Sequence, residues 1–347
     1  MKKTITLFLT FCIMLTSISA FSAVSAAAKT KLHRKDGYIY AYVDGDVQII
    51  RYYGNKSTVE VPSKIDGKNV FKIGWGDSDD FDEDRDALDF GGFSDNKSVK
   101  KVVIPDTVVE LEDLVFDHCT NLNEVVLGDG IETIPPLAFK DCKKLSSVTL
   151  PSSLETIGAY AFRDCISLKK LKLPANLKTI EWDAFSGSGI TKLHLNKKLK
   201  DARFWYCPKL KSLTVNKENN YFSAKKGVLY NKNKTTLLCY PPKKSTVSFT
   251  VPKTVKKIEE YAFVGCNKLK KVKLSKNLLT IEGMAITDCK QLKKVIVKNA
   301  KMKIKDHALG FYLDGTWQKV KGFTIYAKKN SSAEKYARKH KFNFKTI

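Results

Sequence analysis

The chain has 347 residues, with 61 lysine and arginine residues against 36 aspartate and glutamate residues, a formal net charge of +25. A single globular core would be near its upper size limit at this length, and the internal repetition described below removes that limit. No segment after the first 30 residues is apolar enough to cross a bilayer, which excludes a multispan membrane protein, and the positive charge favours an anionic partner.

Residues 1–27 have the order of a secretory signal peptide. Lys2 and Lys3 precede an apolar run, and small residues follow it, with the best cleavage pattern at residues 24–26. A retained membrane anchor is the alternative, although the apolar run is short for a span and contains threonine and serine. We therefore expect a protein that is secreted or held non-covalently at the cell surface, with no transmembrane segment in the mature chain.

An acidic stretch, GDSDDFDEDRDALD, occupies residues 76–89. Asp80, Asp82 and Asp84 alternate as they do in a calcium loop. An EF-hand loop also needs glycine at its sixth place and glutamate at its twelfth, where this chain has Arg85 and Gly91. We expect a solvated loop, and calcium binding stays open as the alternative.

From residue 93 onward one pattern recurs, in copies such as FDHCTNLNEVVLG, FKDCKKLSSVTLP, FRDCISLKKLKLP and FVGCNKLKKVKLS. Successive copies of the cysteine position lie 23 residues apart, at Asn96, Cys119, Cys142 and Cys165 and again at Cys266 and Cys289. A fixed period in the twenties with an LxxLxL core is typical of a leucine-rich repeat. One coil cannot bury its own apolar face, so stability must come from stacking neighbouring coils.

The copy from Cys142 to Cys165 shows how one coil is built. Residues 145–151, LSSVTLP, alternate as a strand with Ser147 and Thr149 outward, and the proline ends the strand. Leu154 and Ile157 form a second inward pair with helix-like or turn spacing, and an Ala-Phe pair follows. We expect an α/β repeat protein, a strand-rich leucine-rich-repeat solenoid of about 23 residues per coil.

The repeat closely resembles the BspA-like (treponemal-type) family of bacterial surface proteins, whose units share the arrangement LPxxLxxIxxxAFxxCxxL. Residues 151–168, PSSLETIGAYAFRDCISL, match it from the proline onward. The resemblance implies an opening coil with the acidic loop at 28–92, a solenoid at 93–322 with an inserted β-hairpin at 216–245, and a capping segment of strand, helix and strand at 323–347. It also implies adhesion, since family members bind extracellular-matrix proteins and other cells.

Two coils depart from the pattern. The coil at 184–195 is one residue short and has Ser188 near the cysteine position. The next, at 199–210, lacks several residues before its cysteine and has Arg203 where alanine would stand. We expect the packing to differ there, through the aromatic run of residues 204–206.

Seven cysteines remain once Cys12 is removed with the signal peptide: six on the repeat and Cys239 in the hairpin. Equivalent residues in stacked coils lie about 4.8 Å apart and point the same way, which is poor geometry for a disulfide. Asn96 and Ser188 at the same position indicate a small buried group that hydrogen-bonds turn backbone. We expect structural thiols, with a disulfide, and then a metal or catalytic site, as the alternatives.

The charge is distributed unevenly. Residues 1–189 carry 23 basic against 27 acidic residues, and residues 190–347 carry 38 against 9, so the C-terminal half has a net charge of +29. Outward strand positions stack into two columns on a solenoid, and this face is where such proteins usually bind. The predicted ligand-binding residues in these columns are Lys170, Lys172, Lys192, His194, Lys271, Lys273 and Lys294. The alternative is that these lysines only keep a repeat protein soluble.

No enzyme motif is recognisable around the five histidines, and no metal-binding or cofactor pattern is present, so we expect a non-catalytic monomer. Its partner would be an extracellular protein or an anionic glycan or wall polymer. Export and the lack of an aromatic stacking platform argue against nucleic acid. The first hypothesis is an adhesive surface protein; the alternatives are an envelope component held to anionic wall polymers by its basic half, and an inhibitor or regulator of an extracellular enzyme.

Overall fold

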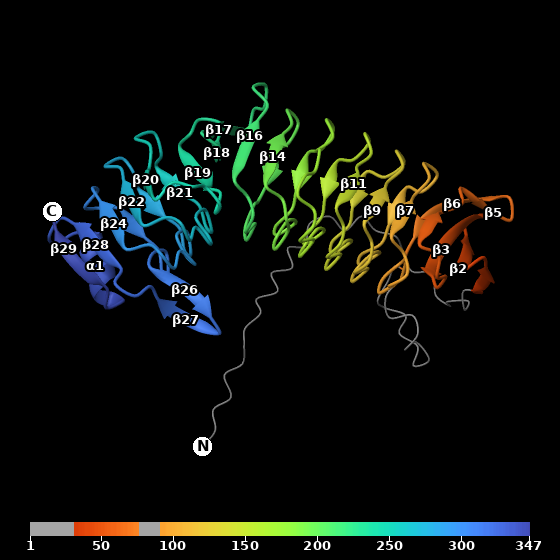
Figure 1. Cartoon of the computed structure of the whole chain (residues 1–347). Coiled ribbons are helices and arrows are strands. Elements are labelled where there is room, and N and C mark those ends of the chain that lie inside the picture. Colours follow the sequence, from red (N-terminus) through yellow and green to blue (C-terminus); the bar gives the residue numbers. More distant parts are fainter. Residues whose placement is uncertain (1–30, 76–90) are drawn as a thin grey trace, which may run out of the picture. The chain divides into compact units, whose positions relative to one another are not determined.

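The computed structural model describes residues 31–75 and 91–347 of the chain. Residues Leu32–Ile347 form one compact unit, in which the coils follow one another in chain order (Figure 1). The predicted signal peptide at 1–27 and the acidic loop at 76–89 lie outside the described residues.

Each regular coil contributes its first strand to one face, which we call the first-strand face. Neighbouring strands pair in parallel without a register shift, so Ser147 lies beside Glu124 and Thr149 beside Val126. Because side chains alternate along a strand, every second residue points inward and the others point to solvent. The strands of this face are β4 (Thr58–Glu60), β7 (Lys101–Val103), β9 (Glu124–Val126), β11 (Ser147–Thr149), β14 (Lys192–Leu195), β16 (Ser212–Val215), β20 (Ser248–Thr250), β22 (Lys271–Leu274), β24 (Lys294–Val297), β28 (Thr324–Ala327) and β29 (Asn343–Thr346).

A second, shorter strand in each coil builds the second-strand face, where helix-like or turn spacing was predicted. Thr156–Ile157 is such a strand, and it pairs in parallel with Thr133–Ile134 and Thr179–Ile180. The strands of this face are β3 (Asp46–Tyr52), β6 (Lys68–Ile73), β8 (Glu110–Leu111), β10 (Thr133–Ile134), β12 (Thr156–Ile157), β13 (Thr179–Ile180), β15 (Asp201–Ala202), β19 (Thr236–Cys239), β21 (Lys257–Ile258), β23 (Thr280–Ile281) and β25 (Lys303–Ile304). The repeat therefore closes with extended chain rather than helix on this side.

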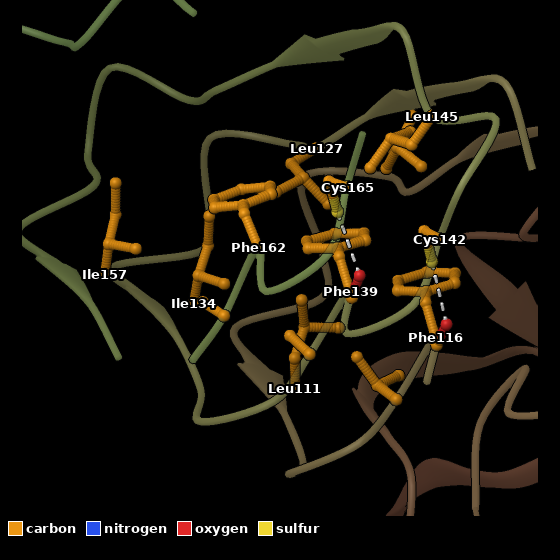
Figure 2. Packing of buried hydrophobic residues seen from close by; sticks show 14 of the residues in the cluster. Leu111, Phe116, Leu127, Ile134, Phe139, Cys142, Leu145, Ile157, Phe162 and Cys165 are labelled. Carbon is orange, nitrogen blue, oxygen red and sulfur yellow. Dashed lines mark hydrogen bonds between the residues drawn. The ribbon is translucent and has the colours of Figure 1, made fainter. Parts of the chain in front are cut away.

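The Ala-Phe pairs form the third side of each coil. The backbone N–H of Phe139 donates to the carbonyl of Ala161 in the next coil at 2.8 Å, and Phe116 and Phe162 repeat this bond one coil away. The buried rings stack with centroids 5.0 Å apart between Phe116 and Phe139 and 5.1 Å apart between Phe139 and Phe162 (Figure 2). Parallel stacking of fully buried rings adds about 0.5–1.5 kcal/mol per pair beyond the burial of their apolar area.

Two residues in each regular coil have a left-handed backbone. One precedes the Ala-Phe pair, as Tyr160 does with φ of 56°, and the other precedes the cysteine, as Asp141 and Asp164 do with φ of 57°. Glycine adopts this conformation readily because it lacks a Cβ, and aspartate and asparagine adopt it at lower cost than other residues because their short polar side chain can hydrogen-bond locally. The recurrent Asp-Cys and Gly-Cys pairs of the sequence thus mark the turn that carries each thiol inward.

The repeat is interrupted between β16 and β20. Strands β17 (Phe222–Lys225), β18 (Val228–Asn231) and β19 form an antiparallel meander, and β19 then pairs in parallel with β21. The inserted segment therefore ends as a strand of the second-strand face. The buried side chains form two main clusters that meet here, since Leu229 and Cys239 belong to the first cluster and Val228 and Tyr230 to the second.

Capping segments cover the two ends of the unit. At the front, β1 (His33–Lys35) and β2 (Tyr38–Val43) form an antiparallel sheet with β3, and β5 (Lys64–Ile65) pairs with β6. At the end, α1 (Ser332–Lys339) lies between β28 and β29. At its start the N–H of Glu334 donates to Oγ of the N-cap Ser331, and Glu334 accepts the N–H of Asn330, the residue before the cap. A second hairpin, β26 (Phe311–Asp314) and β27 (Thr316–Lys319), precedes β28.

The predicted strand-rich leucine-rich-repeat solenoid with about 23 residues per coil is confirmed. Within residues 31–75 and 91–347, α-helix is confined to α1. The α component of the predicted α/β repeat is therefore a property of the cap and not of the coils.

Candidate binding surface

All seven predicted ligand-binding residues point outward on the first-strand face or its continuation. Lys192 and His194 lie on β14, Lys271 and Lys273 on β22, and Lys294 on β24. Lys170 and Lys172 lie between β11 and β14, where the chain continues the face without forming a regular strand. We call the set Lys170, Lys172, Lys192, His194, Lys271, Lys273 and Lys294 the lysine face.

The two columns expected from the sequence are not continuous. Strand β16 pairs with β14 and strand β20 pairs with β22, but β16 and β20 do not pair with each other. The inserted meander enters between them and ends the stacking of first strands. The lysine face therefore consists of an N-terminal group ending at His194 and a C-terminal group starting at Lys271.

The lysine face differs from the front of the molecule in whether its lysines lie beside carboxylates. In the front coils Lys101 Nζ lies 2.9 Å from Glu124 Oε1 in the neighbouring strand. Within the described residues, no lysine of the lysine face has a carboxylate oxygen within 4.0 Å. Lys271 lies in register beside Lys294, so like charges are adjacent across neighbouring strands. Such neighbours repel each other, and an anion between them would lower that repulsion.

Local contacts differ between the two groups. Lys294 Nζ lies 3.7 Å from the centroid of the Tyr326 ring, a cation–π contact that holds the ammonium group over β28. His194 Nδ1 lies 3.0 Å from Thr214 Oγ1 on β16. The N-terminal group is exposed, whereas Lys271, Lys273 and Lys294 are half-buried. The C-terminal group is thus the less exposed of the two.

The seven described cysteines are buried free thiols, which agrees with the structural role predicted for them. Cys142 Sγ donates to the carbonyl of Phe116 and Cys165 Sγ to that of Phe139, each at 3.0 Å across the coil boundary (Figure 2). Burial raises the pKa of the Cys119 thiol to about 12 and also raises the pKa of Cys142 and Cys165. These thiols stay protonated at neutral pH, which makes them poor nucleophiles and poor metal ligands.

Two expectations about the cysteine position need correction. Asn96 bonds backbone as predicted, from Nδ2 to the carbonyl of Gly54 at 3.0 Å, but the buried Ser188 hydroxyl has no hydrogen-bond partner within the described chain. Cys239 is not only a hairpin residue: the N–H of Tyr240 donates to the carbonyl of Ala262, so Cys239 and Tyr240 occupy an Ala-Phe position.

The histidines lie in separate surroundings. His118 Nδ1 lies 2.7 Å from Asp117 Oδ2, while the neighbouring Cys119 thiol points inward to the Phe93 carbonyl at 2.9 Å. His307 and His340 flank Asp306 in the C-terminal part. Within residues 31–75 and 91–347, no three histidine, cysteine or acidic side chains are placed to hold a metal ion together.

An exposed aromatic cluster was missed from the sequence. Trp182 packs edge-on against Tyr160 with centroids 4.5 Å apart, and Arg163 lies over the Tyr160 ring. Further along, Trp205 and Tyr206 pack against Tyr261, which confirms that the aromatic run at 204–206 changes the packing of its coil. Sequence reasoning missed these aromatic contacts. Tyr160 and Tyr261 each precede an Ala-Phe pair and have a left-handed backbone, and this position is the signal that could have found them.

In the part of the chain that the structure covers, no helix has the length and apolarity of a membrane span.

The comparisons with known proteins agree with this geometry. A model of the BspA type leucine rich repeat region matches residues 88–211 and 239–314 in six copies, which is more than half of the chain. The chain belongs to this family. The match omits residues 212–238, the stretch that contains β17 and β18 and interrupts the repeat.

Solved structures show the same fold. A leucine rich cell surface protein from Faecalibacterium prausnitzii is 22% identical, with a TM-score of 0.62 over 92% of this chain and 96% of that one. The pneumococcal vaccine antigen PcpA is 17% identical, with a TM-score of 0.55 over 92% and 99% of the two chains. A leucine-rich repeat protein from Eubacterium ventriosum is 18% identical, with a TM-score of 0.54 over 84% and 82%. Among curated proteins, no sequence matches the chain.

Proposed function

We propose that the protein is an exported cell-surface binding protein that holds an anionic extracellular glycan or wall polymer on its lysine face. The observation that carries the proposal is the set of six lysines, in two groups, without a carboxylate partner among the described residues. In the C-terminal group Lys271 and Lys294 are in register on neighbouring strands, about 4.8 Å apart along the sheet, and this spacing suits the repeated charges of a polymer.

Three further observations support this function. The sequence begins with a signal-peptide pattern at 1–27, and the C-terminal half has a net charge of +29. The Faecalibacterium prausnitzii protein of the same fold is described as a cell surface protein. Adhesion, which the family resemblance implies, would follow where the bound polymer belongs to a host or to a neighbouring cell.

The proposal is tested with heparin as a model anionic glycan, bound to the full mature chain at several salt concentrations. The double variant Lys271→Glu/Lys273→Glu removes two cations of the lysine face. The matched control Lys276→Glu/Lys335→Glu changes the net charge equally at exposed positions off this face. We expect at least a tenfold loss of affinity for the first variant and less than threefold for the second. Equal losses would mean that only net charge matters and would refute a dedicated face.

A second candidate is an envelope component that clings to the anionic polymers of its own cell. The uneven charge favours it, since residues 1–189 have a net charge of −4 and the basic half alone would face the wall. Ionic contacts with polyanions weaken steeply as salt rises. Release of the full chain from its own cells by moderate salt would support this candidate, whereas salt-resistant retention on a purified matrix protein would support adhesion.

A further inference from the structure

The front cap covers one face of the solenoid and leaves the other open. On the second-strand face, β3 continues the stack and β2 and β1 pair in turn beyond it. On the first-strand face, the stack ends at β4, which has β7 as its single strand partner within the described residues. The outer edge of β4 is therefore an unpaired sheet edge.

The hydrogen bonds of β4 show which backbone groups are free. The carbonyl of Ser57 accepts the N–H of Lys101 at 3.0 Å, and the N–H of Val61 donates to the carbonyl of Val103 at 2.9 Å. Residues 57, 59 and 61 therefore turn their backbone groups toward β7. Because these groups alternate in direction along a strand, the N–H and C=O of Thr58 and Glu60 point to the outer edge. Within the described residues neither pair of groups has a partner.

A groove of about 540 Å³ runs along this edge. Its floor is apolar, formed by the buried side chains of Val59, Ile65, Tyr38 and Tyr52. Its rim carries charges of both signs, on Lys56, Glu60 and Lys64, and the far wall holds the ion pair of Lys35 with Asp66 at 2.7 Å. Pro62 limits the edge, since it offers no N–H for a further ladder bond.

We propose that this groove binds a short extended segment of a partner polypeptide as an added strand beside β4. Two N–H donors and two C=O acceptors, placed two residues apart, match the backbone of an extended peptide. The volume lies within the range of about 300–1,000 Å³ that is usual for ligand sites. A sugar or a helix presents no comparable alternation of donors and acceptors, so neither would satisfy the β4 edge.

The register of the site predicts the side chains of the partner. A residue paired opposite Val59 points to the same side of the sheet and meets the apolar floor with Ile65. Its two neighbours point away, toward solvent and the charged rim. The groove therefore selects a polar–apolar–polar triplet with a β-branched residue at its centre. This surface is separate from the lysine face, and the proposal does not depend on glycan binding.

The test uses the full mature chain and the probe peptide acetyl-Lys-Thr-Val-Thr-Val-Thr-Lys-amide. A second peptide has the same side chains but carries N-methyl groups on its threonine residues, whose N–H groups face β4 when a valine lies opposite Val59, so that it cannot donate the ladder in the predicted register. We measure amide hydrogen exchange across residues 57–61 and the affinity of each peptide. The unmethylated peptide should slow exchange at Thr58 and Glu60 and bind at least fivefold more tightly, which corresponds to the loss of one hydrogen bond.

Two variants complete the experiment. Thr58→Pro removes one edge N–H at a position where that group faces the groove, so the fold should tolerate it, and peptide affinity should fall at least fivefold. Thr58→Ala keeps the N–H and should bind as the unaltered chain does. If Thr58→Pro does not fold, the methylated peptide still decides the question on the unaltered chain. No protection of residues 58 and 60 at millimolar peptide, or equal binding of the two peptides, overturns the proposal.

Discussion

Burial of the thiols leads to a quantitative prediction about their reactivity. Cys119 has no exposed surface, and burial raises its pKa to about 12. An ordinary thiol with a pKa of about 8.5 is roughly one quarter ionised at pH 8, whereas a thiol with a pKa of about 12 is ionised to about one part in 10,000. Because the thiolate is the reacting species, alkylation of native Cys119 should be at least about 2,000-fold slower than that of a free thiol.

The assay is iodoacetamide labelling at pH 8, followed by mass spectrometry to locate the modified residues. The variant Arg163→Cys supplies an exposed thiol on the same solenoid, since the Arg163 side chain is 44% exposed. We expect the introduced thiol to label at an ordinary rate and the seven buried thiols to label only after denaturation. Labelling of native Cys119 within tenfold of the rate at residue 163 would falsify the buried thiol row. A shortfall of thiols after denaturation without reductant would show that some of them form disulfides.

Three further predictions concern stability. In the folded protein the pKa of Cys119 and Cys239 is raised to about 12, so their contribution to the free energy of unfolding is fully present below the unfolded pKa of about 8.5 and is lost as pH rises toward 12. The midpoint of urea unfolding should therefore be constant from pH 7 to 8 and fall above pH 9. A midpoint that stays constant to pH 10 would contradict this. Cys142→Ala should destabilise the fold by about 1–2 kcal/mol. Ser188→Ala removes a buried hydroxyl without a partner and should be neutral or stabilising by about 1 kcal/mol. Guanidinium unfolding of both variants checks that Cys142→Ala is the less stable of the two. Phe139→Ala should cost about 3–5 kcal/mol, and Phe139→Leu, which keeps apolar volume but loses the stacked ring, should cost clearly less; a Phe139→Leu variant as stable as the unaltered chain would show that ring stacking contributes nothing.

The repeat period of the sequence predicts only part of the arrangement of the lysine face. A repeat of about 23 residues places Lys271 and Lys294 on the same side of successive coils, because stacked strands keep one register. The family resemblance predicts a hairpin inserted at 216–245, but the sequence does not show whether the first strands on either side of it still pair with each other. The division follows from β16 and β20 not pairing with each other, which depends on how residues 216–247 fold.

The groove at β4 could not be predicted from sequence for a different reason. Residues 57–61 read as an ordinary first strand, and nothing in them says whether a neighbour covers the outer edge. That depends on where the hairpin of β1 and β2 packs, and the hairpin extends the second-strand face. Cap placement is a contact between distant segments, and local pattern carries no information about it.

The sequence by itself determined the repeating coil, its length, the inward cysteine and the outward lysines. Each of these follows from a period that every coil must obey in order to bury its apolar residues against the next. Only the tertiary structure decided which carbonyl each thiol meets, where the lysine face is divided, and that Ser188 lacks a partner. Those outcomes depend on contacts between neighbouring coils, and an inserted strand changes these contacts without changing the local pattern.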